Sequence, residues 1–124
     1  MNVQLLHNRL WLRTCRTVWI VSLALVVYLC LTPSLKQPLD VPGMDKVYHG
    51  LTYSWLALLP QLAFARPGRA AIASGAMIGL GVLLELGQAF VPGRFCSGLD
   101  IAANSLGVGL GLWLGLRLRS ALAA

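Results

Sequence analysis

No charged side chain occurs between Thr17 and Leu35, and this uncharged stretch is mostly apolar. An α-helix of about 20 apolar residues spans the hydrocarbon core of a bilayer, so the stretch is long enough to cross a membrane. Residues 1–16 form a basic leader with three arginines, which we expect to be a helix on the cytoplasmic membrane surface. Because no A-x-A-like cleavage site follows the long apolar run, we expect a retained anchor rather than a signal peptide.

Three more apolar stretches follow, at about 47–65, 70–91 and 101–116. Each is a candidate membrane-spanning helix, and the last is short and rich in glycine. The composition agrees, since 57% of the residues are hydrophobic and only 11% are charged. So few charged residues cannot give a soluble domain a polar surface. The sequence therefore predicts an all-α fold, a four-transmembrane-helix bundle that forms a single domain over residues 17–124.

The net charge of +6 is distributed between the apolar stretches in a pattern typical of membrane topology. Three arginines precede the first stretch, two lie between the second and third, and two follow the fourth. Acidic residues balance the basic ones in the other two connections, 33–46 and 92–100. The positive-inside rule then puts both termini in the cytoplasm and these two connections outside the plasma (inner) membrane. The same distribution argues against a basic patch for nucleic acid.

Glycine recurs every four positions on two of the predicted spans. Gly107, Gly111 and Gly115 form one stripe, and Gly75 and Gly79 form another. Small residues at this spacing let a neighbouring helix approach closely, so we predict that both stripes are packing surfaces that hold the bundle together.

Polar and ionisable side chains gather at the outward-facing ends of the last three predicted spans. Residues three or four apart share a helix face, and the helical rise of about 1.5 Å per residue puts these positions at a similar depth. A charge at the centre of a span costs about 2.5–3.5 kcal/mol even on the lenient insertion scale, so such a cluster indicates function. The residues of this polar cluster are Asp45, Lys46, His49, Tyr53, Glu85, Gln88, Arg94, Asp100 and Asn104.

The residue types predict a pocket that opens to the outer leaflet. Lys46 and Arg94 are suited to meet an anionic group. His49 and Glu85 are candidate catalytic residues, because imidazole and carboxyl groups transfer protons as acid and base. The remaining residues of the polar cluster would bind the ligand.

In the alternative interpretation the polar cluster is structural. Asp100 with Arg94, and Asp45 with Lys46, then form salt bridges at the membrane surface, while the amide side chains make hydrogen bonds between helices.

The three cysteines, Cys15, Cys30 and Cys96, show no metal-ligand spacing. No motif indicates a metal or a cofactor, and we expect none. A disulfide between Cys30 and Cys96 at the outer surface is one alternative; in the other, both are small apolar residues.

Taken in chain order, the polar residues form a motif with a familiar pattern. Its elements are Asp45-Lys46-x-x-His49-x-x-x-Tyr53, Glu85-x-x-Gln88, Pro92, Arg94, Ser97, Asp100, Asn104, Gly107 and Gly111. This motif resembles the signature of the VanZ-like family, and it runs from the first outward connection to the end of the chain. The resemblance implies a small multi-pass membrane protein of the cell envelope, related to a factor associated with resistance to the glycopeptide teicoplanin. Resistance need not be the role of this member.

Three functions compete. In the first, the pocket binds or converts an outer-leaflet anionic lipid or a lipid-linked cell-wall intermediate. In the second, the chain is a non-catalytic interaction protein whose glycine stripes pack against a membrane partner or a second copy. The third, proton or ion translocation, is disfavoured because the inner halves of the predicted spans carry almost no polar groups.

Overall fold

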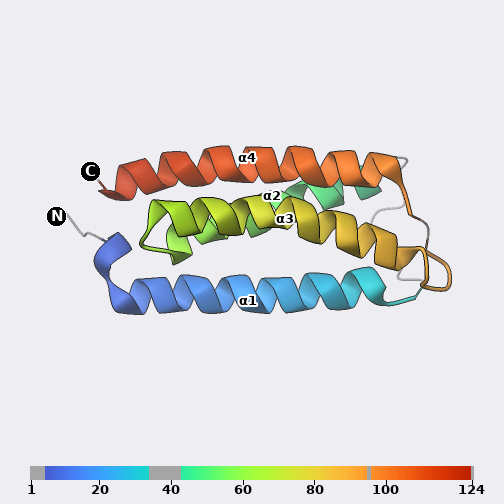
Figure 1. Cartoon of the computed structure of the whole chain (residues 1–124), viewed down its shortest axis with the longest axis horizontal. Coiled ribbons are helices and arrows are strands. Elements are labelled where there is room, and N and C mark those ends of the chain that lie inside the picture. Colours follow the sequence, from blue (N-terminus) through green and yellow to red (C-terminus); the bar gives the residue numbers. More distant parts are fainter. Residues whose placement is uncertain (1–4, 34–42, 95, 124) are drawn as a thin grey trace.

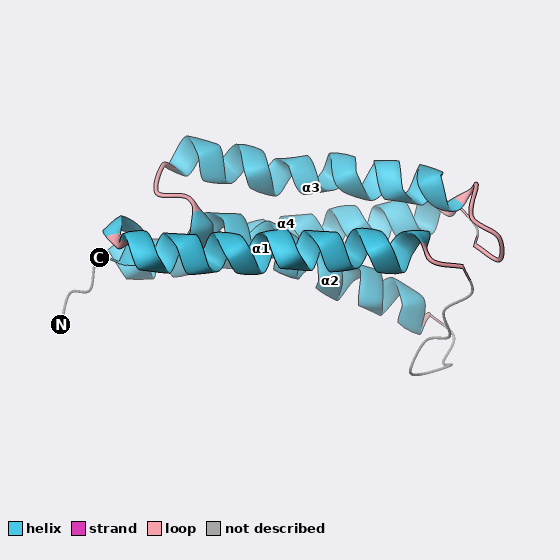
Figure 2. Cartoon of the chain, turned by 90° about the horizontal axis from the view of Figure 1, so that it is seen from below, coloured by secondary structure: helices cyan, strands magenta, loops and turns pink. Residues whose placement is uncertain are grey.

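A computed structural model describes residues 5–33, 43–94 and 96–123, and all regular structure in these ranges is helical. The four long helices lie side by side and alternate in direction, so the two ends of the chain lie at the same end of the bundle (Figures 1 and 2). The all-α prediction is confirmed. In chain order the elements are η1, a 3₁₀ turn (Leu5–His7), α1 (Arg9–Leu31), α2 (Met44–Ala63), α3 (Pro67–Gln88) and α4 (Gly98–Ala123).

Three of these helices, α1, α3 and α4, are long and apolar enough to cross a membrane. Helix α2 has a similar length of 20 residues, but it carries Asp45, Lys46, His49 and Gln61 and is not among the helices apolar enough to cross by composition. The chain is therefore a membrane protein by the composition of three helices, and the fourth crossing stays a prediction.

Helix α1 includes part of the basic leader. The side-chain oxygen of Asn8 accepts hydrogen bonds from the backbone N–H groups of Leu10 (2.9 Å) and Trp11 (3.3 Å), which caps the first turn. The helix then continues without a break to Leu31. Residues 9–16 thus extend the first apolar helix, where the sequence predicts a separate surface helix.

The surface of α1 is largely apolar and uncovered. Cys15 is its one buried residue, whereas Leu10, Ile20 and Tyr28 are each more than half exposed. A large exposed apolar surface is unfavourable in water and favourable in lipid. The outer face of α1 therefore fits a bilayer environment.

Helix α2 contacts each of the other three long helices, most extensively α4. A Cβ atom added at Gly107 would overlap the backbone of Gly50, and one added at Gly111 would overlap the backbone of Ser54. One added at Gly115 would meet the side chain of Gln61. This stripe therefore faces α2, and a hydrogen bond from Ser54 Oγ to the Gly107 carbonyl (2.9 Å) joins the same surfaces.

The packing role predicted for Gly75 and Gly79 within the bundle is wrong. Both are exposed, and a Cβ atom at either position would meet nothing within 4 Å. The buried face of α3 instead includes Gly81, where a Cβ atom would press against Tyr53 and Asn104. A four-residue spacing identifies a stripe on a helix but not the direction in which it faces.

Arginines from neighbouring helices cover the C-terminal carbonyl groups of α2, which have no partner within the helix. Arg119 of α4 donates to the carbonyl oxygens of Gln61 (2.8 Å) and Phe64 (2.7 Å). Arg16 of α1 donates to the carbonyl oxygen of Ala63 (3.3 Å). Basic residues near the two termini therefore join three helices as well as favouring one membrane orientation.

Candidate functional site

The start of α2, the end of α3 and the start of α4 meet at the end of the bundle opposite the termini (Figure 1). They enclose a cavity of about 250 Å³. The lining includes six members of the polar cluster, while Tyr53, Glu85 and Asn104 are buried. The residues that line this polar cavity are Asp45, Lys46, His49, Gln88, Gly93, Arg94, Ser97 and Asp100.

His49 is held between two side chains of α4. Its Nδ1 lies 2.8 Å from Asn104 Oδ1, and its Nε2 lies 3.8 Å from Asp100 Oδ2. An amide oxygen accepts a hydrogen bond, so this contact requires the proton on Nδ1. The buried Asn104 therefore fixes the ring and leaves Nε2 facing Asp100.

Lys46 forms ion pairs with two carboxylates that line the cavity, one on its own helix and one on α4. Its Nζ lies 2.5 Å from Asp100 Oδ1 and 2.6 Å from Asp45 Oδ2. The hydrogen bond with Asp100, followed by that with Asp45, raises the pKa of Lys46, and the hydrogen bond from Lys46 lowers the pKa of Asp45. The Asp45–Lys46 pair of the structural interpretation is confirmed, but Asp100 pairs with Lys46 rather than Arg94.

Arg94 and Gln88 are tied to the C-terminus of α1. Arg94 donates to the carbonyl oxygens of Thr32 and Leu29 at 3.0 Å each, and Gln88 donates to that of Cys30 at 3.0 Å. These bonds pair carbonyl groups that the helix leaves open. Both residues thus have a structural contact, and Arg94 keeps three of its five N–H donors for other partners.

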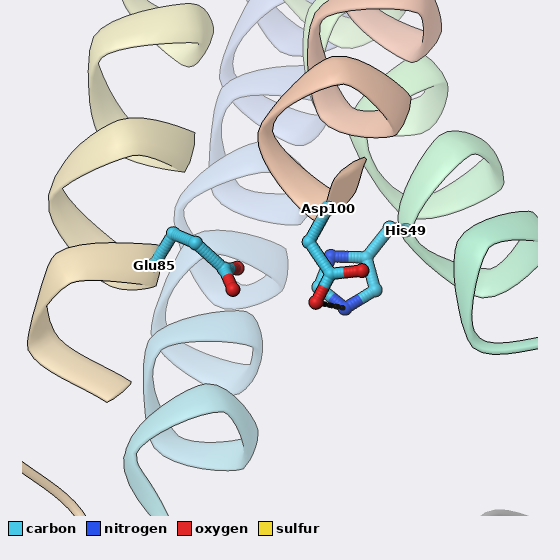
Figure 3. Close-up of side chains that lie close together, drawn as sticks. All are labelled: His49, Glu85 and Asp100. Atoms are coloured by element: carbon cyan, nitrogen blue, oxygen red, sulfur yellow. Dashed lines mark ion pairs between the residues drawn. The ribbon is translucent and has the colours of Figure 1, made fainter. Parts of the chain in front are cut away.

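Glu85 is buried close to two residues of the polar cavity, His49 and Asp100, with 2% of its surface exposed. Its Oε1 accepts a hydrogen bond from the backbone N–H of Ser97 (2.8 Å), which fixes the loop before α4. Figure 3 shows its carboxylate pointing toward His49 and Asp100. One ligand atom of each of these three residues lies within 4.8 Å of the others.

Tyr53 does not line the polar cavity, although the helical spacing grouped it with His49. It belongs to the apolar core, with Leu56, Met77 and Val108. Its predicted role in ligand binding is therefore not supported by a place in the cavity wall.

Sequence reasoning missed a second hollow, an open groove of about 400 Å³ between α2 and α4. Its walls are apolar apart from Lys46 and Ser54, so no polar signal in the sequence marks it. Lys46 also lines the polar cavity, so the two hollows adjoin. The lining residues of this apolar groove are Lys46, Val47, Gly50, Leu51, Ser54, Ala103, Leu106, Gly107 and Leu110.

The inner half of the bundle is also less apolar than the sequence suggested. Gln61 and Ser74 are fully buried there; Gln61 Nε2 donates to Ser74 Oγ (2.9 Å), which donates to the carbonyl oxygen of Ala57 (2.6 Å). These contacts link α2 to α3. The cysteines form no such link, because all three are free thiols and the Cys30–Cys96 disulfide is not formed.

Comparisons with protein-family models, with curated proteins and with solved structures find no match to this chain. The chemistry of this site therefore has to be inferred from its own residues and geometry.

Proposed function

We propose that this chain is a four-span protein of the VanZ-like family that binds an outer-leaflet anionic lipid or a lipid-linked cell-wall intermediate. The observation that carries the proposal is that a polar cavity and an apolar groove adjoin at Lys46. An amphiphile needs both environments, one for its charged headgroup and one for a hydrocarbon chain. A cell-wall intermediate bound here would also connect the chain to the glycopeptide resistance that the resemblance implies.

The proposed topology has both termini in the cytoplasm and the polar cavity outside the plasma (inner) membrane. The alternating helices support it, because an even number of crossings returns the chain to the side on which it began. The packing of α2 supports a fourth crossing, since its polar Gln61 is buried inside the bundle and its side-chain nitrogen donates to Ser74. The arginine-rich end favours the cytoplasm.

The lipid proposal is tested by blocking the apolar groove. Leu106 lines it and is 76% exposed, and tryptophan at this position would fill it. Leu83 of α3 is 68% exposed and lies outside the groove, so it is a matched control. Each variant is purified in mild detergent, and native mass spectrometry identifies the lipids that remain bound.

We expect the wild type and Leu83→Trp to retain one class of anionic lipid and Leu106→Trp to lose it. Chemical modification of the retained lipid by the wild type, absent in His49→Ala, would identify an enzyme rather than a binder. If the wild type retains no class selectively, or if both tryptophan variants lose it equally, the lipid proposal is wrong.

A second candidate, a non-catalytic interaction protein, is favoured by the outward direction of Gly75 and Gly79. Small residues on a lipid-facing surface let another helix approach, from a second copy or a membrane partner. Cross-linking in membranes tests this candidate: Gly75→Leu should abolish an adduct seen with the wild type, whereas absence of any adduct counts against it.

A further inference from the structure

Three side chains that bind metal ions converge from three different helices. His49 lies on α2, Glu85 on α3 and Asp100 on α4, with one ligand atom of each within 4.8 Å of the others. We propose that they form a site for one divalent first-row transition-metal ion, such as Zn²⁺ or Mn²⁺. Because each ligand comes from a separate helix, no spacing in the sequence marks the site.

The orientation of His49 is the first argument. Asn104 holds Nδ1, so the Nε2 of a neutral imidazole carries a lone pair, and this atom lies 3.8 Å from Asp100 Oδ2. Two electron-rich atoms face each other at a distance too long for a hydrogen bond. A cation between them would satisfy both. A histidine that binds metal through one nitrogen commonly donates its other N–H to a neighbouring group, as His49 does to Asn104.

The two carboxylates are also held in the manner of metal ligands. Ser97 N–H binds Glu85 Oε1, and Lys46 binds Asp100 Oδ1. Each carboxylate therefore has one oxygen engaged in orienting the group and another available for a metal. Such outer contacts keep a site in place before the ion binds.

The charge balance is the third argument. Glu85 and Asp100 are 2% and 7% exposed, and among the described residues Lys46 pairs with Asp45 and Asp100 but not with Glu85. An uncompensated carboxylate is costly in such surroundings. A divalent ion would compensate it and relieve the repulsion between the two carboxylates.

The distances allow coordination after small side-chain rotations. Zinc bonds to nitrogen and oxygen of about 2.0–2.2 Å place tetrahedral ligand atoms about 3.4 Å apart. The present separations are up to 4.8 Å, so the widest of them must close by about 1.4 Å. One nitrogen with two carboxylate oxygens suits Zn²⁺ or Mn²⁺, and three protein ligands leave a position open toward the polar cavity.

Coordination would replace the acid–base role predicted for His49 and Glu85. A metal-bound water would then be the group that exchanges protons, because the ion lowers its pKa. Lys46 is already paired with two carboxylates. The ion would therefore supply the positive charge that binds a phosphate headgroup, a step that rests on the proposed function.

The test uses the full chain in detergent, stripped of metal with a chelator and then titrated with Mn²⁺ or Zn²⁺ alone. We expect saturable binding of about one ion per chain, weakened at least about tenfold in His49→Ala and Glu85→Gln, as for loss of a ligand or its support. His7→Ala removes a histidine at the opposite end of the bundle and should bind like the wild type. Circular dichroism verifies that each variant keeps its helices.

Spectroscopy of bound Mn²⁺ assigns the nitrogen ligand. The chain has two histidines, so His7→Ala should keep the nitrogen coupling and His49→Ala should lose it. Absence of saturable binding in the wild type, or unchanged binding in both ligand variants, would overturn the metal site. Since no lipid is added, such a failure leaves the lipid proposal standing.

Discussion

Asn104 orients His49 without lining the polar cavity itself. It is buried and hydrogen-bonds His49, so it selects both the ring orientation and the nitrogen that carries the proton. Asp100 lies one turn earlier on the same helix and faces the other nitrogen. One turn of α4 therefore presents an oxygen to each nitrogen of the His49 ring, and Asn104 makes the hydrogen bond that orients it.

We predict that Asn104→Ala weakens Mn²⁺ binding about 10- to 100-fold, the usual cost of losing a group that orients a ligand. Asn104→Asp, which can still accept from Nδ1, should recover most of the affinity. Titrations of both variants check this. A purely structural Asn104 would give variants that differ in thermal stability but not in metal affinity.

Arg119 carries a second prediction for a single residue. Arg119→Ala leaves the carbonyl oxygens of Gln61 and Phe64 without their donor, so we expect a loss of about 1.5–3 kcal/mol in the free energy of unfolding. Arg117→Ala removes the same charge from an exposed position and should change stability much less. Equal losses in denaturant titrations of the two variants would contradict this capping role.

At the scale of helices, the contact of α2 with α4 depends on glycines that lie on the face of α4 turned toward α2. A Cβ atom added at Gly111 would overlap the backbone of Ser54, whereas one added at Gly109 on the same helix would meet nothing within 4 Å. Two glycines only two positions apart in one helix thus differ in whether a larger side chain fits.

Gly111→Ala should therefore destabilise the bundle by about 1–3 kcal/mol or more, the cost of overpacking a tight contact. Gly109→Ala should stabilise it by up to about 1 kcal/mol, because alanine is the better helix former. Denaturation in detergent micelles measures both. The same sign for the two variants would show that this contact is looser than the structure has it.

The sequence predicted elements better than their contacts. Apolar length and charge gave four helices because both are local properties, and the spacing of Asp45 with His49 and of Asp100 with Asn104 placed each pair on one face. The sequence did not predict that Asp100 pairs with Lys46 or that Tyr53 lies in the apolar core, because both depend on how α2 is rotated against its neighbours. The outward direction of Gly75 has the same origin.

At the scale of the whole molecule, the proposed orientation predicts which surfaces are accessible from outside the cell. Cys96 is exposed in the connection before α4, and Ser120 is exposed near the end of α4, at the opposite end of the bundle. A membrane-impermeant maleimide should label Cys96 in intact cells. It should label a Ser120→Cys variant that lacks the native cysteines only after lysis; the reverse pattern would invert the topology.

The central claim is that the polar cavity and the apolar groove together hold a phosphate-bearing lipid. Its most direct test is native mass spectrometry of the purified chain with two lipids that share the same acyl chains, one with a phosphate headgroup and one neutral. We predict preferential binding of the phosphate-bearing lipid and loss of the preference in Leu106→Trp. Equal binding of the two lipids by the wild type would contradict the claim.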